Sequence, residues 1–272
     1  MKVSSKGWST PFIVWIAIGT VIPLLSIVYY GFTSSKGGLT FSNVTAIFSH
    51  DNFQALLLSL GLAILSTIIC LVVAFPMAMI LKDSKYGKQG FLIFVFILPL
   101  WMNFLLRTMA WQVLLERNGV INSVLGIFGL PGQEIMNTPA AVVLGMVYDF
   151  LPFMILPIYN AVVKIDKHLI DAAYDLGASG KDVYTKVIIP LTVPGIVSGI
   201  TMVLIPALKT FAISNMLGGG KINLIGNIIE QEFTVHSNWY LGSGLSLVMM
   251  IFIILSMLLL NKFDKTGGAS LI

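Results

Sequence analysis

The sequence predicts an all-α membrane protein built from six transmembrane helices. Three observations lead to this fold class: the chain is unusually apolar, its apolar residues fall in six long runs, and its basic residues lie mainly on one side of those runs. Of the 272 residues, 57% are hydrophobic and 10% are charged, whereas a soluble globular chain carries about 25% charged residues. A soluble domain of this length has no core that could hold so much apolar surface, so we expect lipid to cover it.

The six apolar runs are long enough to cross a bilayer, which requires roughly 20 apolar residues in a helix. They lie at about residues 11–32, 53–81, 91–115, 138–163, 195–218 and 242–261. Thr10-Pro11 and Thr138-Pro139 each place a capping hydroxyl before a proline, so we expect the first and fourth spans to begin there. The first run is too long for a signal peptide and is expected to remain as a membrane helix.

The basic residues predict the orientation of these spans. Eleven lysines lie before the first span or after the second, fourth and sixth: Lys2, Lys6, Lys82, Lys85, Lys88, Lys164, Lys167, Lys181, Lys186, Lys262 and Lys265. The opposite side has only Lys36, Arg117 and Lys221, while Arg107 and Lys209 lie inside spans. Because cytoplasmic loops carry the excess of basic residues, we expect both termini in the cytoplasm.

Prolines and glycines within the spans indicate a bundle of kinked helices. A proline inside a span frees backbone groups that neighbouring helices must satisfy. The six such prolines are Pro23, Pro76, Pro99, Pro152, Pro157 and Pro206. Gly195 and Gly199 lie four residues apart at the predicted start of the fifth span, which either permits close helix packing or is a chance pair in a glycine-rich chain.

Several chemistries are excluded by missing motifs. Gly218-Gly219-Gly220-Lys221 is followed by Ile222 and not by Ser or Thr, so it does not form a phosphate-binding loop, and we expect no ATP on this chain. The sequence has no hydrolase or metalloprotease motif, and its single Cys70 and three dispersed histidines predict neither a disulfide nor a metal site. The net charge of +4 is too scattered for nucleic acid. We therefore expect a non-enzymatic chain without a bound cofactor.

The longest predicted cytoplasmic segment runs from Lys164 to about Pro194. Asp166 can cap a short helix, and Gly177 can end it in a left-handed conformation. In that helix one apolar face is formed by Leu169, Ala172, Ala173 and Leu176.

Ser179 and Asp182 have the spacing of a capping box that begins a second helical turn. Its apolar face continues through Val183, Val187 and Ile188 until Pro190 and Pro194 are expected to break the helix. Such an amphipathic segment can lie on lipid, pack on its own bundle, or enter a groove of a partner.

The spacing in this segment resembles a known signature. Asp171-Ala172-Ala173, three residues, Gly177, nine residues and Val187-Ile188-Ile189-Pro190 are similar to the EAA signature of ABC importer permeases, with Asp for Glu, Val for Ile and Ile for Leu. The resemblance implies a type I ABC importer permease whose coupling helix fits a groove on an ATPase subunit. The candidate coupling residues are Asp171, Ala172, Ala173, Leu176, Gly177, Val187 and Pro190. We call residues 164–194 the coupling loop, within a single transmembrane permease domain over residues 1–272.

Further motifs resemble the first permease subunit of spermidine/putrescine importers. They are Leu98-Pro99-Leu100-Trp101-Met102-Asn103 with Arg107, the stretch 147–153, Asp175-Leu176-Gly177-Ala178-Ser179, and Met216-Leu217-Gly218-Gly219 with Leu224-Ile225-Gly226-Asn227. The resemblance implies a multi-pass protein of the bacterial inner membrane that imports polyamines. It also implies a second homologous permease subunit, two ATPase subunits that use ATP and Mg²⁺, and an extracytoplasmic polyamine-binding protein.

Charged and aromatic residues inside the spans are the candidates for a substrate path, because a charge in the bilayer needs a partner or an aqueous route. The candidates are Trp101, Asn103, Arg107, Trp111, Tyr148, Asp149, Tyr159 and Lys209. Asp149 either faces a cationic substrate beside aromatic rings or pairs with Arg107. Arg107 and Lys209 either line the path or lie toward the outer leaflet, snorkelling or pairing with Glu116 or Glu230.

Two alternatives to polyamine import remain. One is an ABC permease for another small solute, such as ferric iron, a sulfate-like anion or thiamine. The other is a secondary carrier, which is expected to show repeated halves with interrupted helices at matching places. The sequence shows no convincing internal repeat.

Overall fold

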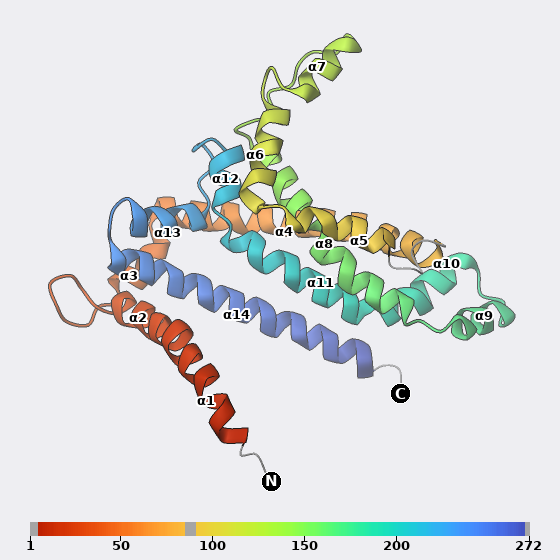
Figure 1. The fold of residues 1–272 in the computed structure, drawn as a ribbon, viewed down its shortest axis with the longest axis horizontal. Coiled ribbons are helices and arrows are strands. Elements are labelled where there is room, and N and C mark those ends of the chain that lie inside the picture. The colour runs from red at the N-terminus through yellow and green to blue at the C-terminus, as the bar shows by residue number, and fades with distance from the viewer. Residues whose placement is uncertain (1–4, 85–90, 270–272) are drawn as a thin grey trace. The chain divides into compact units, whose positions relative to one another are not determined.

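The computed structural model describes residues 5–84 and 91–269, in which helices are joined by loops and one isolated β-bridge links Thr33 and Leu39 (Figure 1). Lys2, Lys85 and Lys88, which contribute to the predicted orientation, lie outside these residues, as do the side chains of Lys6 and Lys265. The predicted all-α fold class is therefore confirmed for the part of the chain that is described.

Five helical segments are long and apolar enough to cross a membrane, and a bent helix pair brings the number to six if it counts as one span. The five are Pro11–Gly31, His50–Asp83, Pro139–Val163, Gly180–Lys209 and Trp239–Leu260, and the bent pair is Phe94–Trp101 with Phe104–Ile127. The predicted number of spans agrees with this set, but several predicted boundaries do not.

The first span is one continuous helical segment. It consists of α1 (Ser5–Ile16), the π-helix η1 (Ala17–Val21) and α2 (Ile22–Gly31). The prediction that Thr10 caps this helix is wrong, because α1 already begins at Ser5 and contains Pro11. The proline replaces an internal backbone donor, which a helix tolerates only with local adjustment.

The predicted third span at residues 91–115 is broken. After α5 (Phe91–Ile97) and the 3₁₀ turn η3 (Leu98–Trp101), the chain bends by 96° and continues as α6 (Phe104–Leu115). Pro99 lies in the 3₁₀ turn, and the side chain of Asn103 accepts a hydrogen bond from the backbone nitrogen of Leu105 at 2.8 Å. A proline and a new N-cap so close together end one helix and begin another.

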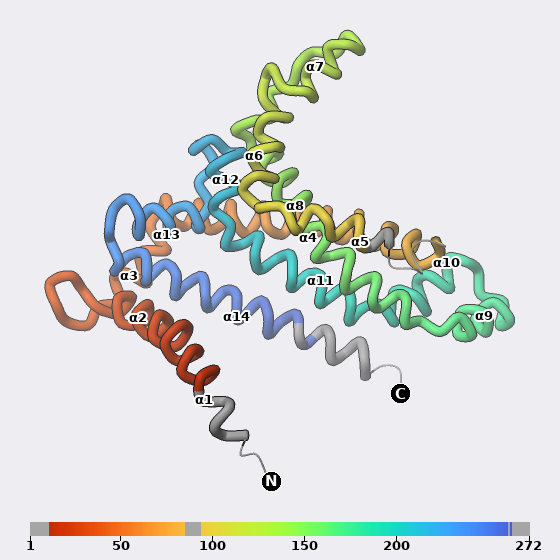
Figure 2. The backbone as a smooth tube through the Cα atoms, viewed as in Figure 1, coloured from red at the N-terminus to blue at the C-terminus, as the bar shows by residue number. Residues whose placement is uncertain are grey.

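The fourth and fifth spans are α8 (Pro139–Val163) and a helix that ends in α11 (Ile189–Lys209), and they lie side by side in Figures 1 and 2. Thr138 caps α8 as predicted, accepting from the Ala141 nitrogen at 3.4 Å. A Cβ added at Gly195 would lie 2.6 Å from the Ala161 Cβ, and one at Gly199 would lie 2.7 Å from the Met154 sulfur. The two glycines therefore permit close packing of α11 on α8, and they are not a chance pair.

The fifth helix differs from its prediction at both ends. It begins with α10 (Gly180–Val183), passes through the π-helix η4 (Tyr184–Ile188) and stops at Lys209, so the predicted range 195–218 is shifted. Pro190 and Pro194 do not break it. Pro190 is the second residue of α11, directly after the π turn, which accommodates the backbone N–H that proline lacks, and α11 continues through Pro194.

Contacts divide the chain into two compact units. The first comprises the described residues up to Leu56 together with Ile228–Phe252, and the second comprises Leu57–Asn227 together with the described residues from Ile253 onward. The remaining elements are α3 (Ser42–Thr45), η2 (Ala46–Phe48), α4 (His50–Asp83), α7 (Val120–Ile127), α9 (Lys167–Asp175), α12 (Ala212–Leu217), α13 (Ile225–Thr234) and α14 (Trp239–Ala269). All candidate site residues lie in the second unit.

Candidate functional site

The coupling loop folds as two capped helical pieces joined by a glycine. The carboxylate of Asp166 accepts a hydrogen bond from the backbone nitrogen of His168 at 3.0 Å and caps α9. Gly177 follows α9 with a φ of +82°, a conformation that strains residues with a Cβ atom. Both features were predicted from the sequence and are confirmed.

The second piece begins with the predicted capping box. The backbone nitrogen of Asp182 donates to the Ser179 hydroxyl at 3.2 Å, and the Ser179 nitrogen donates back to the Asp182 carboxylate at 3.3 Å. The ammonium group of Lys186 lies 2.7 Å from the same carboxylate. These hydrogen bonds, from Lys186 first and then from Ser179, lower the pKa of Asp182 to about 2. The start of α10 is therefore held by interactions within a few residues of sequence.

The α9 helix presents an apolar face that the described chain leaves uncovered. Leu176 is 89% exposed and Leu169 is 52% exposed, with Ala172 exposed between them. By contrast, Val183 and Ile188 of the following pieces are buried. Large exposed apolar side chains on a structured loop are typical of a contact surface for another protein.

Three buried polar residues, Arg107, Thr108 and Asp149, meet between α6 and α8. The Nε atom of Arg107 lies 3.4 Å from Oδ1 of Asp149, and both side chains are more than nine-tenths buried. The Thr108 hydroxyl donates to the other carboxylate oxygen at 3.3 Å. Among the described residues, however, Arg107 Nε, Arg107 Nη1 and Asp149 Oδ1 have no hydrogen-bond partner. We call Arg107 and Asp149 the buried ion pair.

This contact decides between the alternatives that the sequence left open for Arg107. Arg107 lies against Asp149 and not against Glu116 or Glu230, and it is buried and not snorkelling. Asp149 is thus placed as a partner of Arg107, and a role in binding a cation stays a prediction.

The other candidate substrate-path residues do not form one site with this pair. Trp111 and Tyr148 contact each other edge to face, with ring centroids 5.3 Å apart, and line an apolar cavity of about 640 Å³. Trp101 is 74% exposed and contacts Phe94, and Asn103 serves as the cap of α6.

Tyr159 and Lys209 lie elsewhere. Tyr159 is ten residues beyond Asp149 on α8, about 15 Å along the helix at 1.5 Å per residue. It lines a different cavity. Lys209 is the exposed last residue of α11.

A polar cluster that the sequence did not reveal is centred on Asn227. Its side-chain oxygen accepts from the Ser214 hydroxyl at 2.6 Å and from the Leu224 nitrogen at 3.0 Å, and its amide nitrogen donates to the Phe211 carbonyl at 3.0 Å. Asn227 is fully buried, so these bonds replace its hydration. The only local signal was its position in the Leu224-Ile225-Gly226-Asn227 motif. The cluster ties α12 and the residue that precedes it to the start of α13.

Comparisons with known proteins identify the family. Residues 38–266 match the family described as "Binding-protein-dependent transport system inner membrane component". The chain is 36% identical to the spermidine/putrescine transport system permease protein PotB of Haemophilus influenzae over 92% of this chain and 91% of that protein. It is also 36% identical to PotB of Escherichia coli over 87% of this chain and 89% of that protein.

Solved structures agree with this family at the level of the fold. A bacterial ABC transporter involved in the import of the acidic polysaccharide alginate has a chain that superposes with a TM-score of 0.81 and 17% identity, covering 96% of this chain and 94% of that one. A chain of the MetNI methionine ABC transporter superposes with a TM-score of 0.58 and 18% identity, covering 79% of this chain and 95% of that one. From the family match and the curated relatives, we conclude that the chain belongs to the inner-membrane components of binding-protein-dependent transport systems, as a multi-pass, non-catalytic permease subunit of an ABC importer.

Proposed function

We propose that this permease subunit carries polyamines such as spermidine and putrescine into the cell. The observation that carries the proposal is the identity of 36% to PotB permeases, which extends over about nine-tenths of both chains. A resemblance of this length covers both the membrane helices and the coupling loop, so it is not confined to the motif that all ABC importer permeases share.

The proposal includes the assembly. One such chain forms half of a translocation path together with a second, similar permease subunit. Two ATPase subunits bind ATP and Mg²⁺ on the cytoplasmic side, this chain binds no cofactor, and an extracytoplasmic binding protein delivers the substrate. Both termini and the coupling loop are cytoplasmic, as the distribution of lysines predicts.

In this mechanism the α9 helix transmits the closure of the ATPase subunits to the bundle. The exposed Leu169, Ala172 and Leu176 provide the apolar face that would enter the groove. The chain behind them is continuous from Gly180 to Lys209, and α11 packs on α8 through its glycines. A displacement of the loop would therefore move α11 and α8 as one packed pair.

The test of coupling is Gly177→Val. A Cβ at this position meets no other atom within 4 Å, so the substitution acts through its positive φ and not through a clash. We expect ATP-driven spermidine uptake to be lost while the protein still inserts in the membrane. The matched control is Gly180→Val, since Gly180 is the first residue of α10, without a positive φ, and a Cβ there would approach nothing closer than 3.9 Å. Normal uptake by Gly177→Val would contradict the coupling assignment.

The test of the substrate is uptake of radiolabelled spermidine by the assembled transporter, with unlabelled putrescine, ferric iron, sulfate and thiamine as competitors. We expect only polyamines to compete. A pull-down in detergent should contain the second permease and the ATPase.

An Asp149→Asn variant tests whether this carboxylate binds the cation. An unchanged apparent affinity for spermidine in folded protein would exclude Asp149 from the binding site.

A further inference from the structure

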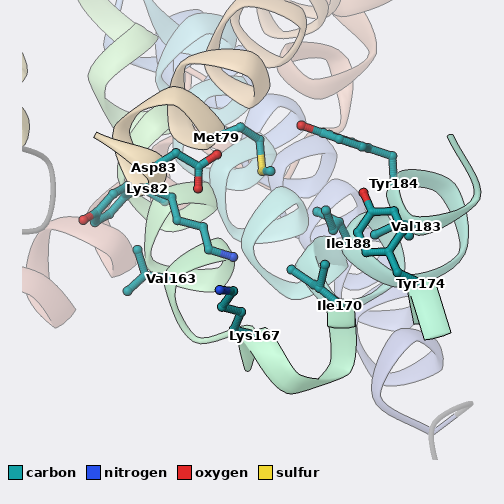
Figure 3. Close-up of a pocket in the computed structure, with 11 residues that line it drawn as sticks. Met79, Lys82, Asp83, Val163, Lys167, Ile170, Tyr174, Val183, Tyr184 and Ile188 are labelled. Atoms are coloured by element: carbon teal, nitrogen blue, oxygen red, sulfur yellow. The ribbon is translucent and has the colours of Figure 1, made fainter. Parts of the chain in front are cut away.

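A second cavity lies behind the coupling loop and is not used by the proposed transport mechanism (Figure 3). It has a volume of about 650 Å³ and lies among the end of α4, the end of α8, α9 and the turn that precedes α11. Its lining combines apolar side chains, among them Met79, Ile170 and Ile188, with amino and hydroxyl groups. A ligand with both an apolar part and an anionic part would match this lining.

The charged groups of the cavity favour an anion. Lys82 and Lys167 extend into the same part of the cavity in Figure 3, and Asp83 contributes one carboxylate at its edge. Within residues 5–84 and 91–269, neither lysine has an ion-pair partner. Two ammonium groups against one carboxylate leave a net positive charge. The hydroxyl-bearing side chains of Tyr174 and Tyr184 line the same space and supply further hydrogen-bond donors.

The position of the cavity identifies the class of anion. Lys82 is in the last turn of the membrane-spanning α4, and Lys167 begins α9 four residues after α8 ends at Val163. Both amines therefore lie where membrane helices leave the bilayer, at the level of lipid headgroups. Basic pockets between membrane helices on the cytoplasmic side are typical binding sites for anionic headgroups.

We propose that this cavity binds the phosphate group of an anionic phospholipid, with Lys82 and Lys167 as its ligands and the apolar lining in contact with the lipid's glycerol and upper acyl chain. The same ammonium groups could hold free phosphate, but the apolar part of the lining favours the lipid. The cavity is distinct from the buried ion pair and from the exposed face of α9.

A lipid in this cavity would support α9 on the side opposite its exposed apolar face. Lys167, Ile170 and Tyr174 line the cavity, whereas the exposed Leu169, Ala172 and Leu176 do not. The two sets are offset by two residues, which is a rotation of about 200° on an α-helix. The cavity and the docking face are thus on opposite sides of one helix. This supporting role rests on the proposed docking of an ATPase subunit, whereas lipid retention itself does not.

The experiment measures lipid retention on the assembled transporter by native mass spectrometry, from nanodiscs that contain phosphatidylcholine with or without phosphatidylglycerol. We expect the wild type to retain phosphatidylglycerol and Lys82→Gln/Lys167→Gln to bind it about a hundredfold more weakly, because each of the two lost charge-assisted hydrogen bonds weakens binding about tenfold. The matched control is Lys164→Gln/Lys181→Gln, which removes the same charge from exposed lysines of the same loop outside the cavity. We expect the control to retain lipid like the wild type.

Two outcomes would overturn the proposal. The first is equal retention by both double variants, which would mean that the lysines attract lipid only through the general charge of the surface. The second comes from phosphatidylcholine nanodiscs with added inorganic phosphate: phosphate binding that depends on Lys82 and Lys167, without retention of phosphatidylglycerol, would identify a soluble ligand. Because no transport turnover is measured, neither result depends on which substrate the importer carries.

Discussion

The coupling loop and the buried ion pair position their side chains in different ways. In the loop, the Asp166 cap and the Ser179–Asp182 capping box join residues two or three positions apart. In the ion pair, Arg107 and Asp149 come from two separate helices that meet only after the bundle has formed. The loop therefore depends on local backbone geometry, whereas the ion pair depends on helix packing. Substitutions in the ion pair should therefore change the stability of the helix bundle, whereas substitutions in the loop should change only the local helix structure.

The largest expected effect is on folding, from the loss of one member of the ion pair. Arg107→Leu would leave Asp149 buried without its cation, and we expect the free energy of unfolding to fall by about 3–5 kcal/mol. The double variant Arg107→Leu/Asp149→Leu should recover most of this loss, because no charge remains buried. Unfolding in detergent with increasing denaturant measures both values. Equal losses in the single and double variants would mean that the unpaired charge of Asp149 is not the cause of the loss.

A smaller effect should follow from overfilling the α8–α11 contact. Gly195→Val would place side-chain atoms against Pro157 and Ala161, and we expect it to cost about 1–3 kcal/mol. Gly61→Val is the control, because a Cβ at Gly61 meets nothing within 4 Å. The free energies of unfolding of the two variants compare a glycine that contacts a neighbouring helix with one that has free space around it. If the control lost as much stability as Gly195→Val, helix propensity and not packing would be responsible.

In the coupling loop the expected effect on global stability is smaller still. Ser179→Ala removes the cap of α10, which typically costs about 1 kcal/mol of helix stability. We expect faster amide hydrogen exchange at the start of α10, unchanged exchange in α8, and reduced coupling of ATP hydrolysis to uptake. Ser179→Thr should keep the cap and the wild-type exchange rates, because a threonine hydroxyl can still accept from the Asp182 nitrogen and donate to the Asp182 carboxylate. Faster exchange in α8 or loss of the folded bundle would show that the loop is not a separate local unit.

The smallest effect concerns the pH dependence of the same cap. The pKa of Asp182 is lowered to about 2, chiefly by its hydrogen bond with Lys186 and then by Ser179. Its stabilising contribution is therefore complete above the ordinary carboxyl pKa of about 3.9 and is lost as the pH falls toward 2. We expect no change of the cap between neutral pH and pH 5. Carboxyl chemical shifts during an acid titration measure this, and Lys186→Gln should raise the pKa of Asp182 more than Ser179→Ala does.

The sequence was most informative where structure is decided by near neighbours. The caps at Thr138, Asp166 and Ser179 and the left-handed Gly177 were all predicted, because each depends on a few adjacent residues. The broken third span was missed even though Pro99 and Asn103 are local signals, because the apolar run continues across them. Hydropathy measures how favourable the transfer of a residue from water to lipid is, and it contains no information about the direction of the backbone.

Residues that depend on tertiary contacts could not be placed in this way. The pairing of Arg107 with Asp149, the polar cluster at Asn227 and the meeting of Lys82 with Lys167 in one cavity each join separate segments. A pattern within one helix gives the face on which a residue lies but not the partner that this face meets. Tyr159 illustrates the limit, because its helix was predicted correctly while its cavity was not.

Composition and the long apolar runs by themselves determined that this is a helical membrane protein, and local signals determined the caps of the coupling loop; the ABC importer type came from the resemblance of that loop to a known signature. These properties depend on the solvent that each segment requires and on short-range backbone geometry, both of which are present in the chain before it folds. The tertiary structure alone decided that Gly195 and Gly199 are packing positions, that Arg107 lies against Asp149, and that α9 has an exposed face opposite a basic cavity. Such contacts are settled only when helices approach one another, because burial, close packing and charge pairing are properties of two surfaces together.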